Sequence, residues 1–460
     1  MNKNHKKNMN RLKTLFFSAL FGVNIFVTAQ TSTTGQIQSF SLKEAIDYAL
    51  LHNALNVNAG IDVQMSVAKK NEIRGLGFPQ ISGSFDLKDY EKLPTQLLPG
   101  EVFGGPPGSF IPVQFGTKYN ATGGIQATLG IFNSDYIVAL QSSKTFLELS
   151  EKNAQRTKIE TVVAVSKAYY AVLINRQRMQ LLEANILRLQ KLLDDTKALN
   201  QNGFVEKTDV DRVEVSYNNL ISEKEKVARL ITVTEYLLKF QMGLDIQTPI
   251  LLNDTMNFSE IPQMPDTSVA EKFEFKNRIE YSLLLNQRKL NELDLKRNRM
   301  GYLPTVFLYS SLSAQAQRNE FDIFNTSKKW YPIGIIGFTM NVPIFDGLQK
   351  NYRIQQSKLS LMKTQNLISY TENAIKLEIS STLTVYQNAI QSLTTQKKNM
   401  QLAEGVYDAA KKKYDAGVGS NLEVMNAETS LKESQTNYYN ALYEYYVAKV
   451  DLDKATGLIK

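Results

Sequence analysis

GIQATLGIFN, at residues 124–133, and GFTMNVPIFD, at residues 337–346, are two versions of one sequence pattern, one in each half of the chain. Two pairs of glycines further along, Gly203 with Gly417 and Gly243 with Gly457, keep nearly the same separation as the two quoted segments. A period of more than 200 residues is too long for the repeats of a solenoid. The sequence therefore predicts an internal two-fold repeat, in which each copy is half of a duplicated domain.

Alternating side chains around the quoted pattern predict β-strands. Between residues 119 and 131, apolar or small residues alternate with polar residues or glycine, which is the period of a strand with one apolar and one polar face. Residues 81–88 and 336–342 alternate in the same way, and residues 305–314 do so less regularly. We expect four strands in two hairpins, near 80–90, 119–131, 304–315 and 333–345.

Long stretches without glycine or proline predict unusually long helices. Residues 134–202, 204–242 and 420–456 contain neither residue type, and residues 348–416 contain only Gly405. We expect helices over 134–202, 204–242, 347–416 and 420–456, the first of them about 100 Å long at ~1.5 Å per residue. Apolar residues such as Leu182, Ile186, Leu189 and Leu193 follow the steps of three and four that are typical of coiled coils. An ordinary helical bundle would not explain why such long helices occur in duplicated pairs.

The segment at 1–29 has the features of a secretion signal. The whole chain has a formal net charge of +8, but five of its cations and none of its acids lie in this segment. Without this segment, the net positive charge of the chain is too small to indicate a nucleic-acid ligand. An apolar run at residues 15–27 precedes Ala29, after which we expect cleavage. The alternative is a membrane anchor, which needs about 20 apolar residues.

Any membrane crossing after Ala29 has to be made by β-strands, because no later stretch is long and apolar enough for a transmembrane helix. Strands cross a membrane only when they close into a barrel, and about eight strands is the minimum. Since four are too few, we expect several copies of the chain to share one barrel. Alternation alone also fits a half-buried sheet in a soluble protein, an alternative that the secretion signal disfavours.

Residue usage argues against an enzyme. The absence of cysteine excludes disulfides and thiolate chemistry. With only two histidines, His5 and His52, a histidine-based metal or acid–base site has almost nothing to be built from. Glycine-rich nucleotide-binding motifs are absent from the sequence. Neighbouring acids such as Asp194 and Asp195 have no candidate base beside them. We predict that the protein is not an enzyme and needs no cofactor or metal.

Segments rich in proline and glycine mark the loops and the boundary between the two copies. Residues 91–118 are predicted to be a long loop between the first two strands, and residues 316–330 a shorter loop between the second two. Residues 244–270 are predicted to be a linker. The predicted organisation is thus a signal peptide at 1–29, a first repeat at 30–243, the linker at 244–270 and a second repeat at 271–460.

The mature chain resembles the TolC-type outer-membrane efflux proteins. The resemblance rests on SLKEAI at residues 41–46, on Pro79 and Pro304 between helix and strand, on IFDG at residues 344–347, and on the paired glycine turns. It implies a homotrimer in which four strands per copy build a twelve-stranded outer-membrane barrel, continued across the periplasm by a coiled-coil α-helical barrel. It also implies a passive exit duct that docks to a periplasmic adaptor (membrane fusion) protein and, through the adaptor, to an inner-membrane transporter.

The same resemblance assigns roles to the two helix-to-helix turns. Gate residues at the periplasmic end would be Glu423, Asn426, Asp209 and Tyr414. The tip that docks to the adaptor would consist of Gly203, Phe204, Val205, Gly417, Val418 and Gly419. Gly419 stands where some family members have an arginine that joins Asp209 and Tyr414 in holding the tip closed. For Glu423, an ordinary exposed acid at the start of a helix is the alternative.

Other functions fit parts of the sequence. The chain could be the outer-membrane component of type I protein secretion, and its cargo could be drugs, metal ions or polypeptides. A structural coiled-coil protein of the envelope would not need alternating strands between its helices. A simple porin would need more strands and no long helix.

Overall fold

A computed structural model describes residues 38–254 and 273–459. The predicted signal peptide at 1–29 and most of the predicted linker at 244–270 lie outside the described residues. Among the described residues, 38–39 and 247–251 form a small unit, and the others form a large unit. The small unit holds most of a two-stranded sheet, β1 (Gln38–Phe40) with β6 (Ile250–Leu252).

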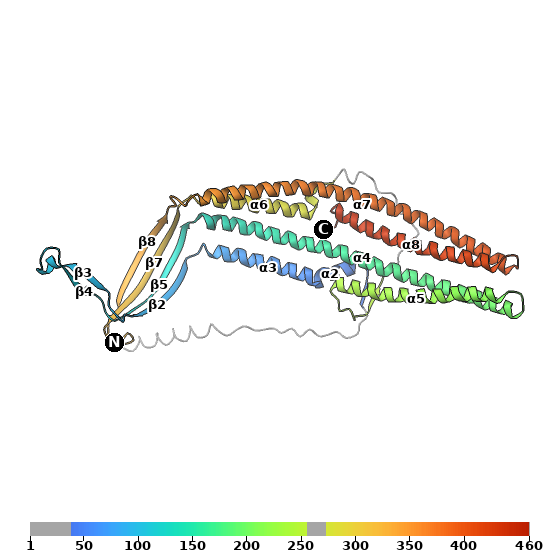
Figure 1. The fold of residues 1–460 in the computed structure, drawn as a ribbon, viewed down its shortest axis with the longest axis horizontal. Coiled ribbons are helices and arrows are strands. Elements are labelled where there is room, and N and C mark those ends of the chain that lie inside the picture. The colour runs from blue at the N-terminus through green and yellow to red at the C-terminus, as the bar shows by residue number, and fades with distance from the viewer. Residues whose placement is uncertain (1–37, 255–272, 460) are drawn as a thin grey trace, which may run out of the picture. The chain divides into compact units, whose positions relative to one another are not determined.

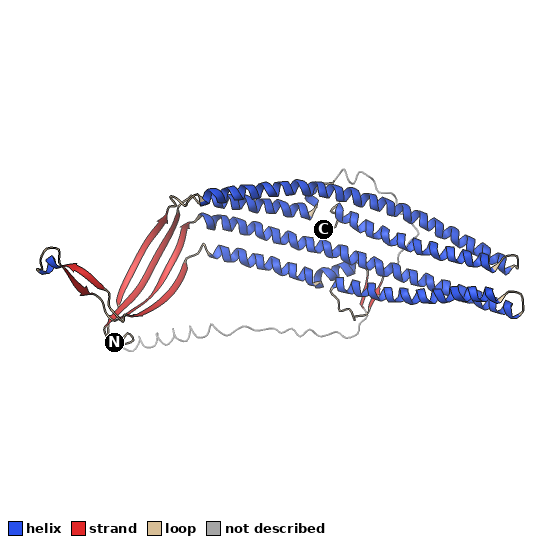
Figure 2. Ribbon diagram, viewed as in Figure 1, coloured by secondary structure: helices blue, strands red, loops and turns tan. Residues whose placement is uncertain are grey.

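The large unit contains a four-stranded antiparallel sheet (Figure 2). Its strands are β2 (Gln80–Asp89), β5 (Tyr119–Phe132), β7 (Thr305–Arg318) and β8 (Tyr331–Asn341), in the order β2-β5-β7-β8. All four lie where the alternation predicts strands. The order makes β2 and β8 the edges of the sheet.

The register of the sheet places most of the large apolar side chains of β2, β5 and β7 on one face, while β8 carries isoleucines on both faces. Ile125 pairs with Gly83 and Leu312, whereas the next residue, Gln126, pairs with Ser82 and Ser311 on the other face. Large side chains on the apolar face are mostly exposed in the single chain: Ile125 is 58% exposed and Leu312 is 65% exposed. A sheet with this much uncovered apolar surface needs a second apolar medium or partner.

A hairpin of two short strands, separate from the four-stranded sheet, occupies the segment that the sequence predicts to be a loop. Within residues 91–118, β3 (Thr95–Pro99) pairs with β4 (Phe110–Gln114), and a 3-10 turn, η1 (Gly100–Phe103), joins them. The loop prediction is therefore wrong for this segment. Proline lowers the expectation of a strand, but a two-stranded ribbon consists only of edge strands, which tolerate proline. Pro99 and Pro112 both lie in this ribbon.

Long helices make up most of the large unit. They are α4 (Ser134–Gln201), α5 (Lys207–Met242), α7 (Gln349–Asp415) and α8 (Asn421–Ala455), each within a few residues of the range expected from the sequence. Shorter helices are α2 (Leu42–His52), α3 (Ala54–Gly75) and α6 (Ile279–Met300), and a 3-10 turn, η3 (Phe275–Asn277), precedes α6. In the described residues, no helix is long and apolar enough to cross a membrane.

Helix ends follow the local chemistry of the sequence. A capping box starts α2: the Ser41 side chain accepts from the Glu44 backbone N–H, and the Glu44 carboxylate accepts from the Ser41 backbone N–H. Asn133 caps α4 by accepting from the backbone of Asp135 and Tyr136. The cap at Asn133 therefore fixes where strand β5 ends and α4 begins.

Each strand of the four-stranded sheet connects directly to one helix at the same end of the sheet (Figure 1). Helix α3 leads into β2, β5 leads into α4, α6 leads into β7, and β8 leads into α7. These four helices pack side by side in the order α3, α4, α6, α7, which repeats the order of their strands. Beyond them, α5 returns along α4 and α8 returns along α7.

At the end of the helices that lies away from the sheet, a shared core joins the hairpin α4/α5 to the hairpin α7/α8. A cluster of buried side chains from α4, α5, α7 and α8 includes Leu189, Leu192, Val213, Val424 and Leu431. Helix α8 also contacts α4 directly, and the buried Asn185 side chain on α4 donates to Gln435 on α8 at 2.6 Å. The two hairpins are thus held together by apolar packing and by a buried polar contact.

Candidate functional site at the helical tips

Both helical hairpins reverse at a glycine in the left-handed region. Gly203 has φ of +79° and Gly417 has φ of +75°, a conformation that other residues adopt at a cost. The Phe204 backbone N–H donates to the Leu199 carbonyl at 2.9 Å, and the Val418 N–H donates to the Lys413 carbonyl at 3.0 Å. These bonds satisfy carbonyls at the helix ends. The two predicted tips therefore have the same turn geometry.

Apolar side chains at the tips are exposed. Phe204 is 77% exposed and Val418 is 80% exposed, while Val205 is half-buried. Gly419 lies close against the preceding helix: a Cβ added there would be 2.9 Å from the Lys413 Cβ and 2.9 Å from the Tyr414 backbone nitrogen. The structure therefore places the predicted docking residues on two adjoining turns, with apolar groups directed away from the core.

Glu423 lies in the first turn of α8 and has a partner within the same chain. Its backbone N–H donates to the Ser420 side chain at 3.2 Å, and its carboxylate lies 3.2 Å from the Lys413 ammonium. About half of each charged side chain remains exposed, so water screens the pair. Asn426, one turn further along, is exposed. The acid at the predicted gate is thus partly neutralised by Lys413, a contact that the sequence did not indicate.

Asp209 and Tyr414 do not bond to each other in the described chain. The Asp209 carboxylate lies 3.3 Å from Arg212, and its backbone carbonyl accepts from the Asn421 side chain at 3.1 Å. The Tyr414 hydroxyl is buried without a hydrogen-bond partner among the described residues. The bond from Asn421 to the Asp209 carbonyl is one contact that joins the two tips, and the sequence did not single out Asn421.

Glu428 is a buried acid between the two hairpins that sequence reasoning missed. It is 5% exposed, and neither carboxylate oxygen has a hydrogen-bond partner in the described chain. Burial raises the pKa of the Glu428 carboxyl, while the Arg188 and Lys432 cations counteract part of that rise. The spacing contains the signal, because Glu428 follows Val424 by four residues and precedes Leu431 by three, which places it on the apolar stripe of α8.

Comparisons with known proteins agree with this architecture. Residues 285–458 match the family model of the "Outer membrane efflux protein". The chain is 22% identical to the outer membrane protein TolC of Escherichia coli (strain K12) over 363 residues, which cover 75% of this chain and 71% of TolC. It is likewise 24% identical over 349 residues to the outer membrane efflux protein BepC of Brucella suis, covering 74% of this chain and 73% of BepC. The family model and these relatives support a TolC-type outer-membrane efflux protein.

Solved structures share the fold of this TolC-type chain. The outer membrane protein VceC from Vibrio cholerae superposes with a TM-score of 0.69 at 15% identity, over 90% of this chain and 96% of VceC. The CmeC outer membrane channel of Campylobacter jejuni gives 0.72 at 16% identity, over 90% and 85% of the two chains. As a TolC-type protein, the chain resides in the outer membrane of a Gram-negative envelope and extends into the periplasm.

Proposed function

We propose that three copies of the chain assemble into the passive exit duct of an efflux pump. The observation that carries the proposal is the four-stranded sheet, which has one exposed apolar face, one face that is polar along β2, β5 and most of β7, and two edge strands. Three such sheets joined edge to edge give a barrel of twelve strands, with β2 of one copy beside β8 of the next. The apolar face then meets lipid and the polar face lines water.

The helices extend this wall in the proposed assembly. Because each strand connects directly to a helix, a closed ring of strands continues into a ring of long helices. The similar lengths of α4 and α7, 68 and 67 residues, and of α5 and α8, 36 and 35 residues, support an origin by duplication, with repeats at 30–243 and 271–460 on either side of the linker at 244–270. A conduit needs polar walls and no catalytic group.

Membrane conductance tests the duct and its two faces together. Because the chain has no native cysteine, Gln126→Cys and Ile125→Cys each introduce a single thiol on neighbouring residues of opposite faces. In planar bilayers, a charged, membrane-impermeant thiosulfonate reagent should alter the current through Gln126→Cys and leave Ile125→Cys unchanged. A preparation without conductance, or an equal response of both variants, would contradict the proposal.

The tip is proposed to dock to a periplasmic adaptor and, through it, to an inner-membrane transporter. Exposed Phe204 and Val418 on adjoining turns support an apolar contact made by Gly203, Phe204, Val205, Gly417, Val418 and Gly419. Single cysteines at 204 and 418 should crosslink to the adaptor during transport, whereas a cysteine at Lys226, on the side of α5, should not. Equal crosslinking at all three positions would count against a tip-specific dock.

The gate is proposed to lie at Glu423 and Asn426, with Asp209 and Tyr414 behind them. Three copies of Glu423 around an axis would repel one another and attract cations, although Lys413 lowers the net charge of each copy. Divalent cations should therefore block the channel less strongly in Glu423→Ala and more strongly in Lys413→Gln. Unchanged block in both variants would remove Glu423 from the gate.

A second candidate function is the outer-membrane step of type I protein secretion. The chain is 20% identical to the alkaline protease secretion protein AprF of Pseudomonas aeruginosa over 319 residues, covering 68% of this chain and 64% of AprF. Loss of the chain from its host should raise the intracellular level of a small-molecule dye if the chain serves efflux. Loss of a polypeptide from the medium, with dye levels unchanged, would favour secretion.

A further inference from the structure

A cleft of about 980 Å³ lies against all four helices that continue the sheet. Its lining comes from α3, α4, α6 and α7, which pack in that order. A single cleft can touch both the first and the last helix of a curved layer only if the cleft lies on the concave side of that layer. The cleft is therefore on the concave side of the helical wall.

The cleft also lies on the polar side of the sheet. Asp135 and Ala139 line it, and the same two residues line a smaller pocket together with Gln80 and Thr128 of the sheet. Gln80 pairs with Thr128, one register step from the pair of Ile81 with Ala127, so both belong to the polar face. In the proposed duct, to which this inference is tied, the cleft faces the lumen just below the barrel.

Only some of the charged side chains that line the cleft have a neighbour of opposite charge. Five cations and two acids line it. Three of the cations have acidic neighbours: Lys69 lies 2.7 Å from Glu72, Arg297 lies 2.8 Å from Asp294, and Lys350 lies 3.7 Å from Asp346.

The two remaining cations, Lys70 on α3 and Arg353 on α7, form no side-chain ion pair or hydrogen bond with any described residue. Asp135 is the one lining acid without an ion pair among the described residues, and it lies in the first turn of α4, where the helix dipole already stabilises it. The cleft thus contains two cations, Lys70 and Arg353, that have no acidic partner among the described residues.

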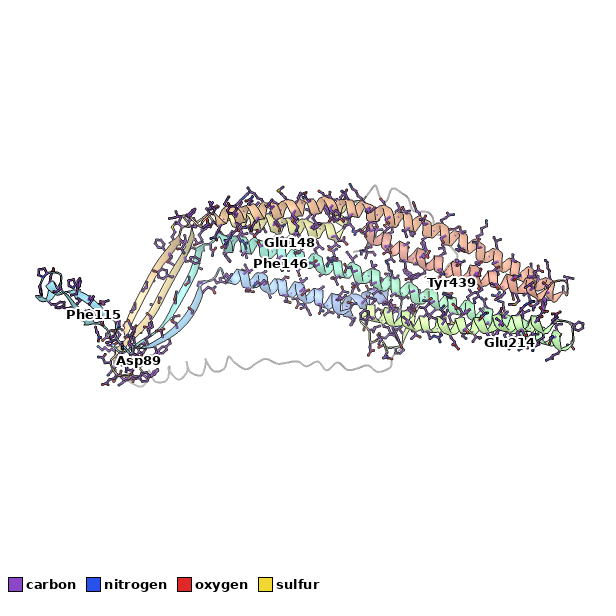
Figure 3. All side chains as sticks on the ribbon, viewed as in Figure 1. Asp89, Phe115, Phe146, Glu148, Glu214 and Tyr439 are labelled. Carbon is purple, nitrogen blue, oxygen red and sulfur yellow. The ribbon has the colours of Figure 1, made fainter. Side chains whose placement is uncertain are left out.

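Apolar side chains also line the cleft. Phe146 on α4 is 52% exposed, and Leu290 and Leu293 on α6 are half-buried. Phe146 lies on the stretch of α4 that runs beside α6 (Figure 3). An apolar surface with a few charged groups at its margin is the usual composition of a small-molecule site.

We propose that this cleft binds amphiphilic organic anions, with Lys70 and Arg353 at the anionic group and Phe146, Leu290 and Leu293 against the apolar body. Arg and Lys both pair with carboxylate and sulfonate oxygens through charge-assisted hydrogen bonds. A cleft repeated in each copy would concentrate such solutes in the lumen. The cargo of the duct would then include organic anions with an apolar body.

Equilibrium dialysis of the full chain in nanodiscs tests this site, with 2-naphthalenesulfonate as the probe and empty nanodiscs as the blank. Methanesulfonate supplies the anionic group alone, and 1-naphthylmethylammonium supplies the ring with the opposite charge. We expect naphthalenesulfonate to bind once per chain and more tightly than either reference. Lys70→Gln with Arg353→Gln should weaken it by at least about tenfold, since two charge-assisted bonds are lost, and Phe146→Ala should weaken it with no effect on methanesulfonate.

The matched control is Lys144→Gln with Arg299→Gln. Lys144 and Arg299 lie nine residues beyond the cleft residues Asp135 and Leu290, about two and a half helical turns, and so on the opposite sides of α4 and α6. Equal affinity for the sulfonate and the ammonium, or equal losses in both double variants, would overturn the proposal. The conductance of the same preparation separates the outcomes, because a conducting channel without this preference refutes only the anion site.

Discussion

The hairpin α4/α5 and the hairpin α7/α8 have matching lengths and the same turn, yet they place equivalent residues in different surroundings. Glu214 and Glu428 are equivalent in the repeat, since their separation along the chain equals that of the turn glycines Gly203 and Gly417. Glu214 lies 3.8 Å from Lys197 and is 47% exposed (labelled in Figure 3), whereas Glu428 is 5% exposed and has no hydrogen-bond partner among the described residues. Helix α8 packs against both α4 and α7, while α5 packs mainly against α4. Position in the repeat therefore predicts backbone geometry, and tertiary packing decides burial.

The largest expected difference between the two hairpins comes from replacing each of the equivalent acids, Glu428 and Glu214, in turn. Glu428→Leu should raise the free energy of unfolding by about 1–3 kcal/mol, because it removes a buried acid whose oxygens are unsatisfied. Glu214→Leu should change it by less than about 0.5 kcal/mol, since an exposed pair contributes little. Denaturation of the detergent-solubilised protein, followed by circular dichroism, measures both. A loss of stability in Glu428→Leu would contradict the cost assigned to burying carboxylate oxygens that have no hydrogen-bond partner.

The pH dependence of stability should differ between wild type and Glu428→Leu. Burial raises the pKa of Glu428 above its ordinary value of 4.5, so the folded chain retains a proton that the unfolded chain has lost. This contribution to stability is complete below the ordinary pKa and is lost as the pH rises through the raised pKa, by at most about 1.4 kcal/mol per pH unit. Unfolding curves from about pH 4 to about pH 8 should show the wild type losing stability relative to the variant. A constant difference would show that Glu428 does not titrate in this range.

The two tips should respond differently to alanine at equivalent positions. Gly419→Ala forces a Cβ against the backbone of Tyr414 and should destabilise that tip by about 1–2 kcal/mol. At the equivalent position of the other tip, Val205 already has a side chain, so Val205→Ala should have little effect. Amide hydrogen exchange over residues 413–424 should accelerate by about tenfold in Gly419→Ala. Unchanged exchange would mean that the turn adapts to the added methyl.

The smallest expected difference concerns the helix caps after the turns. Ser420 caps α8 by accepting from the Glu423 backbone, whereas Glu206, at the start of α5, makes no such bond. Ser420→Ala should therefore cost about 1 kcal/mol and Glu206→Ala only a few tenths. Thermal unfolding of the two variants under one condition measures the difference, and equal shifts would remove the cap as an asymmetry between the hairpins.

The sequence predicted most of the fold because the helices and strands follow strong local rules. The near absence of glycine and proline located α4, α5, α7 and α8, and alternation located the four strands of the sheet. The hairpin of β3 and β4 was missed because Pro99 and Pro112 resemble loop residues, although a ribbon without neighbours accepts them.

The candidate site was less predictable, since it depends on contacts between distant segments. The pairing of Lys413 with Glu423 across a turn, the bond from Asn421 to the Asp209 carbonyl, and the burial of Glu428 all depend on how the hairpins pack. Of these, only the place of Glu428 on the apolar stripe of α8 is visible in the spacing. The basic cleft was equally hidden, because Lys70 and Arg353 are far apart in the sequence and lie on the two outermost helices of the layer.

Native mass spectrometry of the protein released from its host membrane in mild detergent tests the central claim, that one chain supplies a third of a closed wall. The account predicts a single assembly with the mass of three mature chains, stable until the detergent is made denaturing. A stable single chain, or an assembly of any other number of copies, would contradict it.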